Sequence, residues 1–399
     1  MSAPVPSHTP RLTAVLRDGE RVTSLELFFD LVFVLALTQC TALMAGTPTW
    51  EGVLKGLLVL GVLWWSWVGY AWLTSVVDPE EGSVRLVMFA AMAALLVAAL
   101  CVPRAFGGDA LLFACAYAVV RAAHIGLFML ASRDDAALRS SVIGLAGSTA
   151  VGVGLLVGAA FAPGGLQLGI WGLALLLDMG GPFLFGAEGW KLVPGHFAER
   201  HGAIIIIALG ESIVAIGAGA NGGVDAGVVA AAVLGMVVAG ALWWMYFDVV
   251  AIVAERRLTK ATEGRERNEI ARDSYSYLHL PMVAGIALVA LGMKKTLAHV
   301  GDPLGLVPAA AMLGGGALYL LAHVAFRWRN IRTLNRQRLL CAGLLVSLLL
   351  VESKLKPPSL AILGALAALL SSLILYEATH FAELRDRIRH QLTREGASG

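Results

Sequence analysis

Twelve apolar runs, most of them about 20 residues long, are the feature that most constrains this chain. They cover residues 24–45, 52–73, 84–102, 109–131, 140–161, 166–186, 201–220, 226–251, 274–293, 305–326, 338–352 and 358–380. The hydrocarbon core of a bilayer is about 30 Å thick, and a helix needs roughly 20 apolar residues to cross it. Because backbone groups in lipid must pair within their own segment, the runs predict helices. We therefore expect an all-α integral membrane protein with about twelve transmembrane helices.

The low charge content excludes other classes of protein. Charged residues make up 15% of the 399 residues and hydrophobic residues 58%, whereas a soluble domain carries about 25% charged residues. A soluble, disordered, collagen-like or nucleic-acid-binding chain does not fit this composition. The lipid bilayer is therefore the expected partner, and no nucleic acid is expected. Nothing in the sequence indicates the oligomeric state.

The distribution of lysine and arginine predicts the orientation. If residues 1–23 lie in the cytoplasm, the outer loops hold Arg104, Lys294, Lys295, Lys354 and Lys356. Lys55 and Arg121 lie within apolar runs, and the other 23 of the 30 lysines and arginines fall on the cytoplasmic side. An excess of positive charge on that side is typical of polytopic proteins. We expect a bacterial cytoplasmic (inner) membrane protein with both termini, including the tail 383–399, in the cytoplasm.

The two halves of the chain share short patterns that suggest an internal repeat. Leu63-Trp64-Trp65 resembles Leu242-Trp243-Trp244, and Tyr117 with Arg121 resembles Tyr319 with His323. We expect a first six-span repeat at 24–190 and a second at 191–382. Six spans per repeat make the two repeats parallel, with a pathway between them. The basic segment 255–272 in the second half, and the stretch 383–394, are predicted to form amphipathic helices at the cytoplasmic surface.

Ionisable side chains inside the apolar runs are the candidate functional residues, because a charge in lipid costs several kcal/mol without a partner or cavity. The first run carries Glu26, Asp30 and Gln39. Glu26 and Asp30 lie one turn apart on the same helical face, a pair that suits proton or cation handling. The alternative for Glu26 is a position at the interface, paired with Arg21 or Arg200.

The seventh run begins with Glu199 and Arg200 and carries Glu211 near the bilayer midplane. Arg121 is a candidate partner for Glu211, as is His124. Asp178 lies at a similar depth, and the Gly180-Gly181-Pro182 triplet that follows it predicts a broken or kinked helix of the kind that lines binding cavities. Structural pairing is the alternative for each of these residues.

No motif of a soluble enzyme is present. The sequence lacks G-x-S-x-G, Walker A, dinucleotide-binding and H-E-x-x-H patterns. We expect no cofactor, no metal and no catalytic residues, although an enzyme is not excluded.

Two motifs resemble those of the bacterial low temperature requirement A family. Glu26-Leu27-Phe28-Phe29-Asp30-Leu31-Val32-Phe33-Val34, followed by Thr38-Gln39, is similar to the family's opening signature. Phe197-x-Glu199-Arg200-x-Gly202, followed by Ile206-Ile207-x-Leu209-Gly210-Glu211-Ser212, is similar to its second signature. The resemblance implies a bacterial multi-spanning membrane protein and does not define a biochemical activity.

We expect a permease that moves a small solute or ion, with proton coupling as an option. Asp30 and Glu211 would be the ionisable gate or coupling groups, and Glu26, Gln39, Arg121, Asp178, Glu199 and Arg200 would shape the field around them. The alternatives are an intramembrane enzyme acting on a lipid or isoprenoid through buried acid–base groups, a passive ion channel, and a structural or sensory protein.

Overall fold

A computed structural model describes residues 21–184, 189–220 and 223–380. Within these ranges every regular element is helical, and an isolated β-bridge joins Pro303 and Pro358. The predicted all-α class is therefore confirmed. The predictions for residues 1–20 and for a helix at 383–394 lie outside the described residues.

The chain forms two compact units. The first consists of Met1–Cys40, Lys55–Arg200 and Ala261–Glu269, and the second of Thr41–Leu54, His201–Lys260 and Ile270–Gly399. Four helices contribute residues to both units, namely Ser24–Gly46, Trp50–Thr74, Pro194–Gly219 and Arg265–Ile270. Each unit is described by itself.

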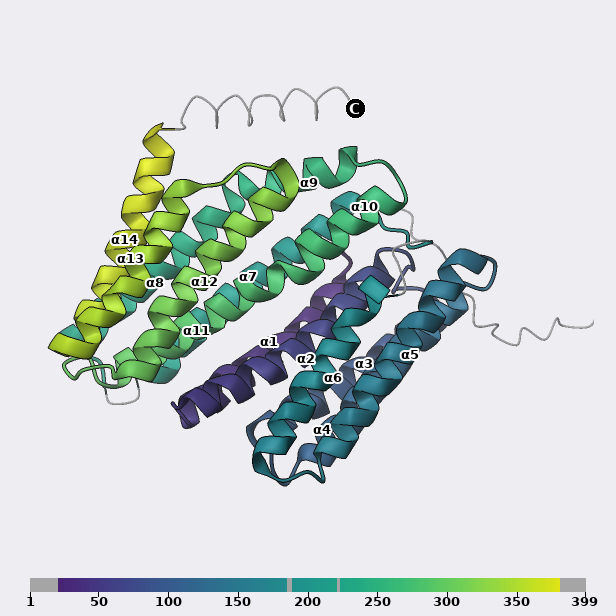
Figure 1. The fold of residues 1–399 in the computed structure, drawn as a ribbon, viewed down its shortest axis with the longest axis horizontal. Coiled ribbons are helices and arrows are strands. Elements are labelled where there is room, and N and C mark those ends of the chain that lie inside the picture. The colour runs from purple at the N-terminus through teal and green to yellow at the C-terminus, as the bar shows by residue number, and fades with distance from the viewer. Residues whose placement is uncertain (1–20, 185–188, 221–222, 381–399) are drawn as a thin grey trace, which may run out of the picture. The chain divides into compact units, whose positions relative to one another are not determined.

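The first unit is built mainly from the helices of the N-terminal half. They are α1 (Ser24–Gly46) up to Cys40, α2 (Trp50–Thr74) from Lys55, α3 (Gly82–Cys101), α4 (Ala110–Ala131), α5 (Ala136–Ala159), α6 (Gly164–Leu184) and the first turns of α7 (Pro194–Gly219). A single 3₁₀ turn, Val102–Arg104, follows α3. Successive helices pack against each other from α3 to α6 (Figure 1).

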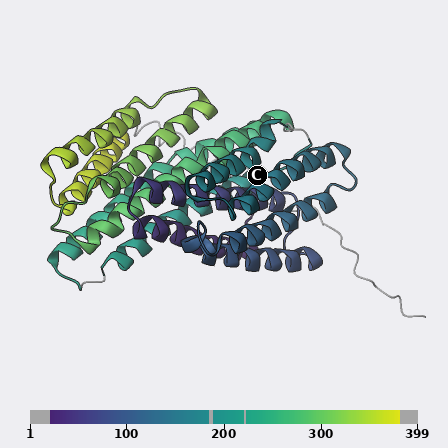
Figure 2. The ribbon, with the colours of Figure 1, turned by 60° about the horizontal axis from the view of Figure 1, so that its bottom comes forward.

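The second unit contains the rest of α7, α8 (Ala226–Phe247), α9 (Val250–Lys260), α11 (His279–Ala298), α12 (Leu306–Ile331), α13 (Arg336–Leu355) and α14 (Ser359–His380). The short helix α10 (Arg265–Ile270) leads through a π-helical segment, Ala271–Tyr277, into α11. Helix α11 packs on α8, α12 and α14 and is buried along almost its whole length. Figure 2 shows the green and yellow helices of this unit, which Figure 1 labels, from a second direction.

Glycine allows the closest helix crossing in the second unit. A Cβ atom on Gly285 of α11 would lie 2.7 Å from the carbonyl oxygen of Gly315 on α12. A Cβ atom on Gly315 would likewise lie 2.7 Å from the carbonyl oxygen of Gly285. Small residues at such crossings let helix backbones approach in membranes, where packing rather than water exclusion drives association. The α11–α12 contact is the tightest part of the core that positions the polar residues of this unit described below.

Local sequence signals define several helix starts. Asp135, Asp225 and Asn335 each accept a hydrogen bond from the backbone N–H three residues later, at the beginning of α5, α8 and α13. These side chains satisfy donors that a helix N-terminus leaves without a partner. Between the capped ends, the apolar composition of each run is sufficient for a helix in lipid.

The protein surface is apolar where the helices would meet lipid. Large apolar side chains such as Leu86 and Leu340 are 70% and 69% exposed, which is unfavourable over a large area in water. By length and composition, eleven helices among the described residues can cross a membrane. These observations establish a multi-span helical membrane protein that has lipid as its environment.

The predicted run 338–352 is also helical but is less apolar than the others. It corresponds to α13, which packs on α12 and α14 and is not among the eleven. Charged residues at both of its ends, Arg336, Arg338, Glu352 and Lys354, account for the difference. Glu352 is nevertheless buried and accepts a hydrogen bond from the backbone N–H of Gly305.

Two local predictions differ from the structure. Helix α6 continues without a break through Gly180, Gly181 and Pro182 to Leu184. The predicted break is therefore wrong, while the alternative of a kink stays a prediction. Membrane helices tolerate proline where neighbouring groups and local adjustments satisfy the freed backbone carbonyl. The segment 255–272 is not one amphipathic helix, because the chain leaves helical structure at residues 261–264, where Gly264 has a φ of 93°.

Candidate functional site

Two helices of the first unit present matched pairs of polar residues. Glu26 and Asp30 lie one turn apart on α1, and His196 and Arg200 lie one turn apart on α7. The Nε2 atom of His196 is 2.8 Å from Oε1 of Glu26, and Nη2 of Arg200 is 3.0 Å from Oδ1 of Asp30. Both contacts are buried from solvent. The two helix starts therefore run in the same direction and form a two-step polar ladder.

Glu26 is held by its own helix terminus as well as by His196. Its Oε2 atom accepts hydrogen bonds from the backbone N–H and the hydroxyl of Thr23, while Thr23 Oγ1 accepts from the N–H of Glu26. This reciprocal arrangement is a capping box, which satisfies donors at the start of α1. Since a carboxylate only accepts, His196 donates from Nε2. Glu26 thus has partners for both oxygens.

Asp30 is less completely satisfied than Glu26. Its Oδ1 atom accepts from Nε1 of Trp67 on α2 at 2.9 Å and from Arg200. Within the described residues, Oδ2 of Asp30 and the Nε and Nη1 atoms of Arg200 are buried without a hydrogen-bond partner. The guanidinium also lies 5.6 Å from the centre of the Trp67 ring. This is a buried ion pair with unused hydrogen-bonding capacity on both sides.

A second buried ion pair in the same unit joins two more of the predicted residues. Nη2 of Arg121 on α4 is 2.9 Å from Oδ1 of Asp178 on α6, and both side chains are almost completely buried. Thr149 on α5 donates to Oδ1 of Asp178 at 2.8 Å, and Tyr117 on α4 donates to Oδ2 at 2.9 Å. Every oxygen of this carboxylate therefore has a partner. Arg121, predicted as a partner of Glu211, has Asp178 as its ion-pair partner.

Helix α2 lies against both pairs. Trp67 donates to Asp30, and two residues further on a Cβ atom at Gly69 would lie 3.1 Å from Nη1 of Arg121 and 2.8 Å from Cε1 of His124. Only a residue without a side chain allows α2 to approach α4 so closely. One stretch of α2 therefore contacts the polar residues of α1 on one side and those of α4 on the other.

The second unit holds a comparable ion pair between α13 and α14. Arg338 donates to both oxygens of Glu377 at 3.0 and 2.9 Å and to Nδ1 of His323 at 2.7 Å. Asn335 also donates to Glu377. This fork-shaped contact uses both oxygens of the carboxylate. Each unit therefore holds a largely buried arginine–carboxylate pair, although the internal repeat itself stays a prediction.

A buried histidine follows the π-helical segment of the second unit. Nδ1 of His279 is 3.0 Å from the carbonyl oxygen of Ser274, and its Nε2 is 2.8 Å from the hydroxyl of Tyr246. Because a carbonyl only accepts, Nδ1 donates to Ser274, while Nε2 and the Tyr246 hydroxyl form the second hydrogen bond. The ring also stacks on Tyr275. His279 thus has two hydrogen bonds and an aromatic neighbour.

The remaining predicted residues are Glu199, Gln39 and Glu211. Glu199 is exposed and accepts from the backbone N–H of Val22 at 3.2 Å. Gln39 is half-buried and lies nine residues beyond Asp30 on α1, on the opposite face. Glu211 is buried in the second unit. That Glu211 and Asp30 face one pathway remains a prediction.

Sequence reasoning missed His196 and Thr149. The available signal for His196 was its spacing of four from Arg200, which matches the spacing of Glu26 and Asp30. Thr149 had no such signal, because a threonine in an apolar helix commonly bonds within its own helix. Among the described residues, no group of three or more His, Cys, Asp or Glu side chains could hold a metal ion.

Comparison with known proteins identifies the family. The family model described as bacterial low temperature requirement A protein (LtrA) matches residues 21–375. A protein of Rhizobium meliloti (strain 1021), described as uncharacterized, is 30% identical over 326 residues, which cover 79% of each chain. No solved structure matches the chain. The family match includes both signature motifs and nearly all of the helices described above, and the chain therefore belongs to the bacterial low temperature requirement A family.

Proposed function

We propose that this protein is a permease that moves a small solute or ion, and that the Asp30–Arg200 pair is its ionisable gate. The observation that carries the proposal is the unused hydrogen-bonding capacity of this buried pair. Buried polar atoms are nearly always paired, so each exception calls for an explanation. An ion, a water molecule or a polar substrate group that contacts Oδ2 of Asp30 would supply one.

The contrast with the other ion pairs supports this choice of residues. Asp178 and Glu377 use both of their oxygens in contacts with arginine and neutral donors. Glu26 also uses both oxygens. Such saturated groups stabilise a fixed arrangement, whereas Asp30 can gain a partner without losing one. We assign the other buried carboxylates of the first unit a structural role.

The chemistry of the ladder suits a proton or a cation. Asp30 lies six residues from the start of α1, about 9 Å along the helix. If Asp30 binds a proton or cation, its attraction for Arg200 weakens, and the guanidinium becomes available to an anionic group. Trp67 keeps its hydrogen bond to Oδ1 in either state and positions the carboxyl group. Coupling would then consist of exchanging one partner of Asp30 for another.

The test uses variants that keep the interior neutral. Breaking one side of a buried pair is destabilising, but replacing both partners with apolar residues of similar size is often tolerated. We would reconstitute Asp30→Leu/Arg200→Met in proteoliposomes and measure proton entry with a trapped pH-sensitive dye under an imposed potassium diffusion potential. The matched control is Arg121→Met/Asp178→Leu, which removes from the same unit a pair whose carboxylate has partners on both oxygens.

We expect the Asp30→Leu/Arg200→Met protein to fold and to lose proton flux by about tenfold or more, the change that about 1.4 kcal/mol makes in a rate. The control should fold and keep its flux. Wild-type flux in the Asp30→Leu/Arg200→Met protein would refute the assignment of the gate. Wild-type protein that passes no protons but releases trapped potassium or sodium down their gradients would favour the passive channel.

We further infer that the protein lies in the cytoplasmic membrane with both termini in the cytoplasm. The bias of lysine and arginine towards one set of loops supports this orientation. Cysteine labelling of intact cells at residue 104, which lies in a predicted outer loop, and at residue 336, in a predicted inner loop, tests it. Labelling of residue 336 but not of residue 104 by a membrane-impermeant reagent would reverse the orientation.

A further inference from the structure

An open cleft lies on the surface of the first unit, at one end of helices α3, α4 and α5. It measures about 450 Å³. Val87 of α3 and Gly126, Leu127 and Leu130 of α4 line its apolar part. A Cβ atom added to Gly126 would have no heavy atom within 4 Å, so the cleft is open at this position.

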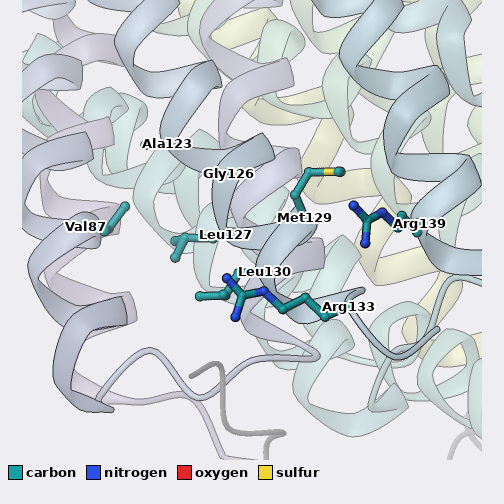
Figure 3. Close-up of a pocket in the computed structure, with 8 residues that line it drawn as sticks. All are labelled: Val87, Ala123, Gly126, Leu127, Met129, Leu130, Arg133 and Arg139. Atoms are coloured by element: carbon teal, nitrogen blue, oxygen red, sulfur yellow. The ribbon is translucent and has the colours of Figure 1, made fainter. Parts of the chain in front are cut away.

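Two arginines line the end of the cleft where α4 stops and α5 starts. Arg133 lies in the turn after Ala131, the last residue of α4, and Arg139 lies in the first turns of α5. Figure 3 shows the Arg133 side chain reaching back beside Leu130, with Arg139 beyond Met129. Two cations therefore share one cleft with apolar side chains.

Neither guanidinium makes a hydrogen bond or ion pair with the described part of the chain, and both side chains are exposed. The nearby Asp135 is engaged in other contacts and does not neutralise the two arginines. Asp135 caps α5 by accepting from the N–H of Leu138, and its other oxygen is 2.9 Å from Nζ of Lys191. Arg133 and Arg139 thus bring two positive charges to the cleft, and the exposed Asp134 follows Arg133 in sequence.

We propose that this cleft binds one anionic phospholipid. The acyl chain would lie along the apolar wall formed by Val87, Leu127 and Leu130, and the phosphate would bind Arg133 and Arg139 at the membrane surface. Guanidinium groups bind phosphate through charge-assisted, often bidentate hydrogen bonds. Basic pockets between transmembrane helices on the cytoplasmic side recognise anionic headgroups in this way, and the predicted orientation places both arginines on that side.

The combination of features favours a lipid over a soluble anion. A soluble anion needs the arginines but gains nothing from an apolar wall on α3 and α4. A lipid uses both, because the end of a transmembrane helix places the two arginines at headgroup depth and the cleft at acyl-chain depth. The site is separate from the Asp30–Arg200 pair, so its test does not depend on the proposed transport function.

The test is native mass spectrometry of the full-length protein in detergent, titrated with phosphatidylglycerol or with phosphatidylcholine that has the same acyl chains. Arg133→Gln/Arg139→Gln removes the proposed headgroup contacts. Gly126→Leu adds a side chain at the apolar part of the cleft, where an added Cβ atom has no heavy atom within 4 Å. The matched controls are Arg336→Gln, an exposed arginine outside the cleft, and Gly147→Leu, an exposed glycine of α5 that likewise has no atom within 4 Å of an added Cβ.

We expect wild-type protein to bind one phosphatidylglycerol more tightly than phosphatidylcholine. In the double arginine variant, the ratio of the two affinities should be smaller by about tenfold or more, since each arginine near an anionic surface contributes about 1 kcal/mol. Gly126→Leu should weaken the binding of both lipids, and the two control variants should weaken the binding of neither. Unchanged binding in both cleft variants would overturn the proposal. So would competition by inorganic phosphate as effective as that by lipid, or a change of oligomeric mass in Gly126→Leu.

Discussion

The Asp178 cluster allows a quantitative test of what a fully hydrogen-bonded buried carboxylate contributes. Asp178→Leu would remove three hydrogen bonds, those from Arg121, Thr149 and Tyr117. Leaving a buried charge without its partner costs about 3–5 kcal/mol. The two neutral hydrogen bonds add about 0.6 kcal/mol each inside a membrane protein. We therefore expect the free energy of unfolding to fall by about 4–6 kcal/mol.

The double variant Arg121→Met/Asp178→Leu completes a mutant cycle. With no charge left in the interior, its cost should be about 2 kcal/mol or less, because apolar replacement of both partners is often tolerated. The interaction energy between the two positions would then be at least about 5 kcal/mol, which is larger than the roughly 0.5–3 kcal/mol common for contacting pairs. Arg121→Met alone should cost nearly as much as Asp178→Leu, since it leaves the carboxylate buried.

Unfolding in mixed micelles of increasing sodium dodecyl sulfate content measures these values. The ten tryptophans of the chain provide a fluorescence signal. Additive costs, with the double variant as unstable as the two single variants combined, would refute the reasoning. A cost of less than about 1 kcal/mol for Asp178→Leu would do the same, because it would mean that water or lipid headgroups reach the cluster.

Two further predictions concern other parts of the chain. Gly285→Leu should lower the melting temperature in detergent and cost about 1–3 kcal/mol, because its Cβ atom would meet the Gly315 carbonyl oxygen at 2.7 Å; unchanged melting would show that α11 and α12 can separate without penalty. Asp135→Ala should cost about 1 kcal/mol through loss of the α5 cap, whereas Asp135→Asn should keep most of it. The Leu138 N–H and Lys191 hold the pKa of Asp135 below its usual value. Its contribution is therefore present above pH about 3.9, the value in an unfolded chain, and is lost as the pH falls through the lower folded-state value. The melting temperatures of wild type and Asp135→Ala should draw together as the pH falls from 6 towards the folded-state pKa, and a constant difference would contradict the assignment.

The helix positions could be predicted from sequence almost throughout. Most of the twelve apolar runs begin and end within a few residues of a helix, from α1 (Ser24–Gly46) to α14 (Ser359–His380). The exceptions have local reasons. Proline does not break α6, because membrane helices tolerate proline where neighbouring groups satisfy the freed carbonyl. The start of α7 at Pro194 lies in a polar stretch that apolar windows exclude.

The site residues were predicted less completely than the helices. Asp30, Glu26, Arg200, Arg121 and Asp178 could be selected because charge inside an apolar run is unusual. Which of the carboxylates have hydrogen-bond partners on both oxygens could not be predicted from sequence. That distinction depends on neutral partners such as Thr149 and Trp67, which are common residues in any membrane helix.

The sequence by itself determined the membrane class, the number and limits of most helices, and the set of buried charges. These follow from local hydrophobicity, because a backbone in lipid must satisfy its hydrogen bonds within its own segment. Only the tertiary structure decided the pairing. Asp30 meets Arg200 across 170 residues of sequence, and such contacts depend on how each helix is rotated about its axis and on which helix it packs against. Neither quantity is encoded in the composition of a single run.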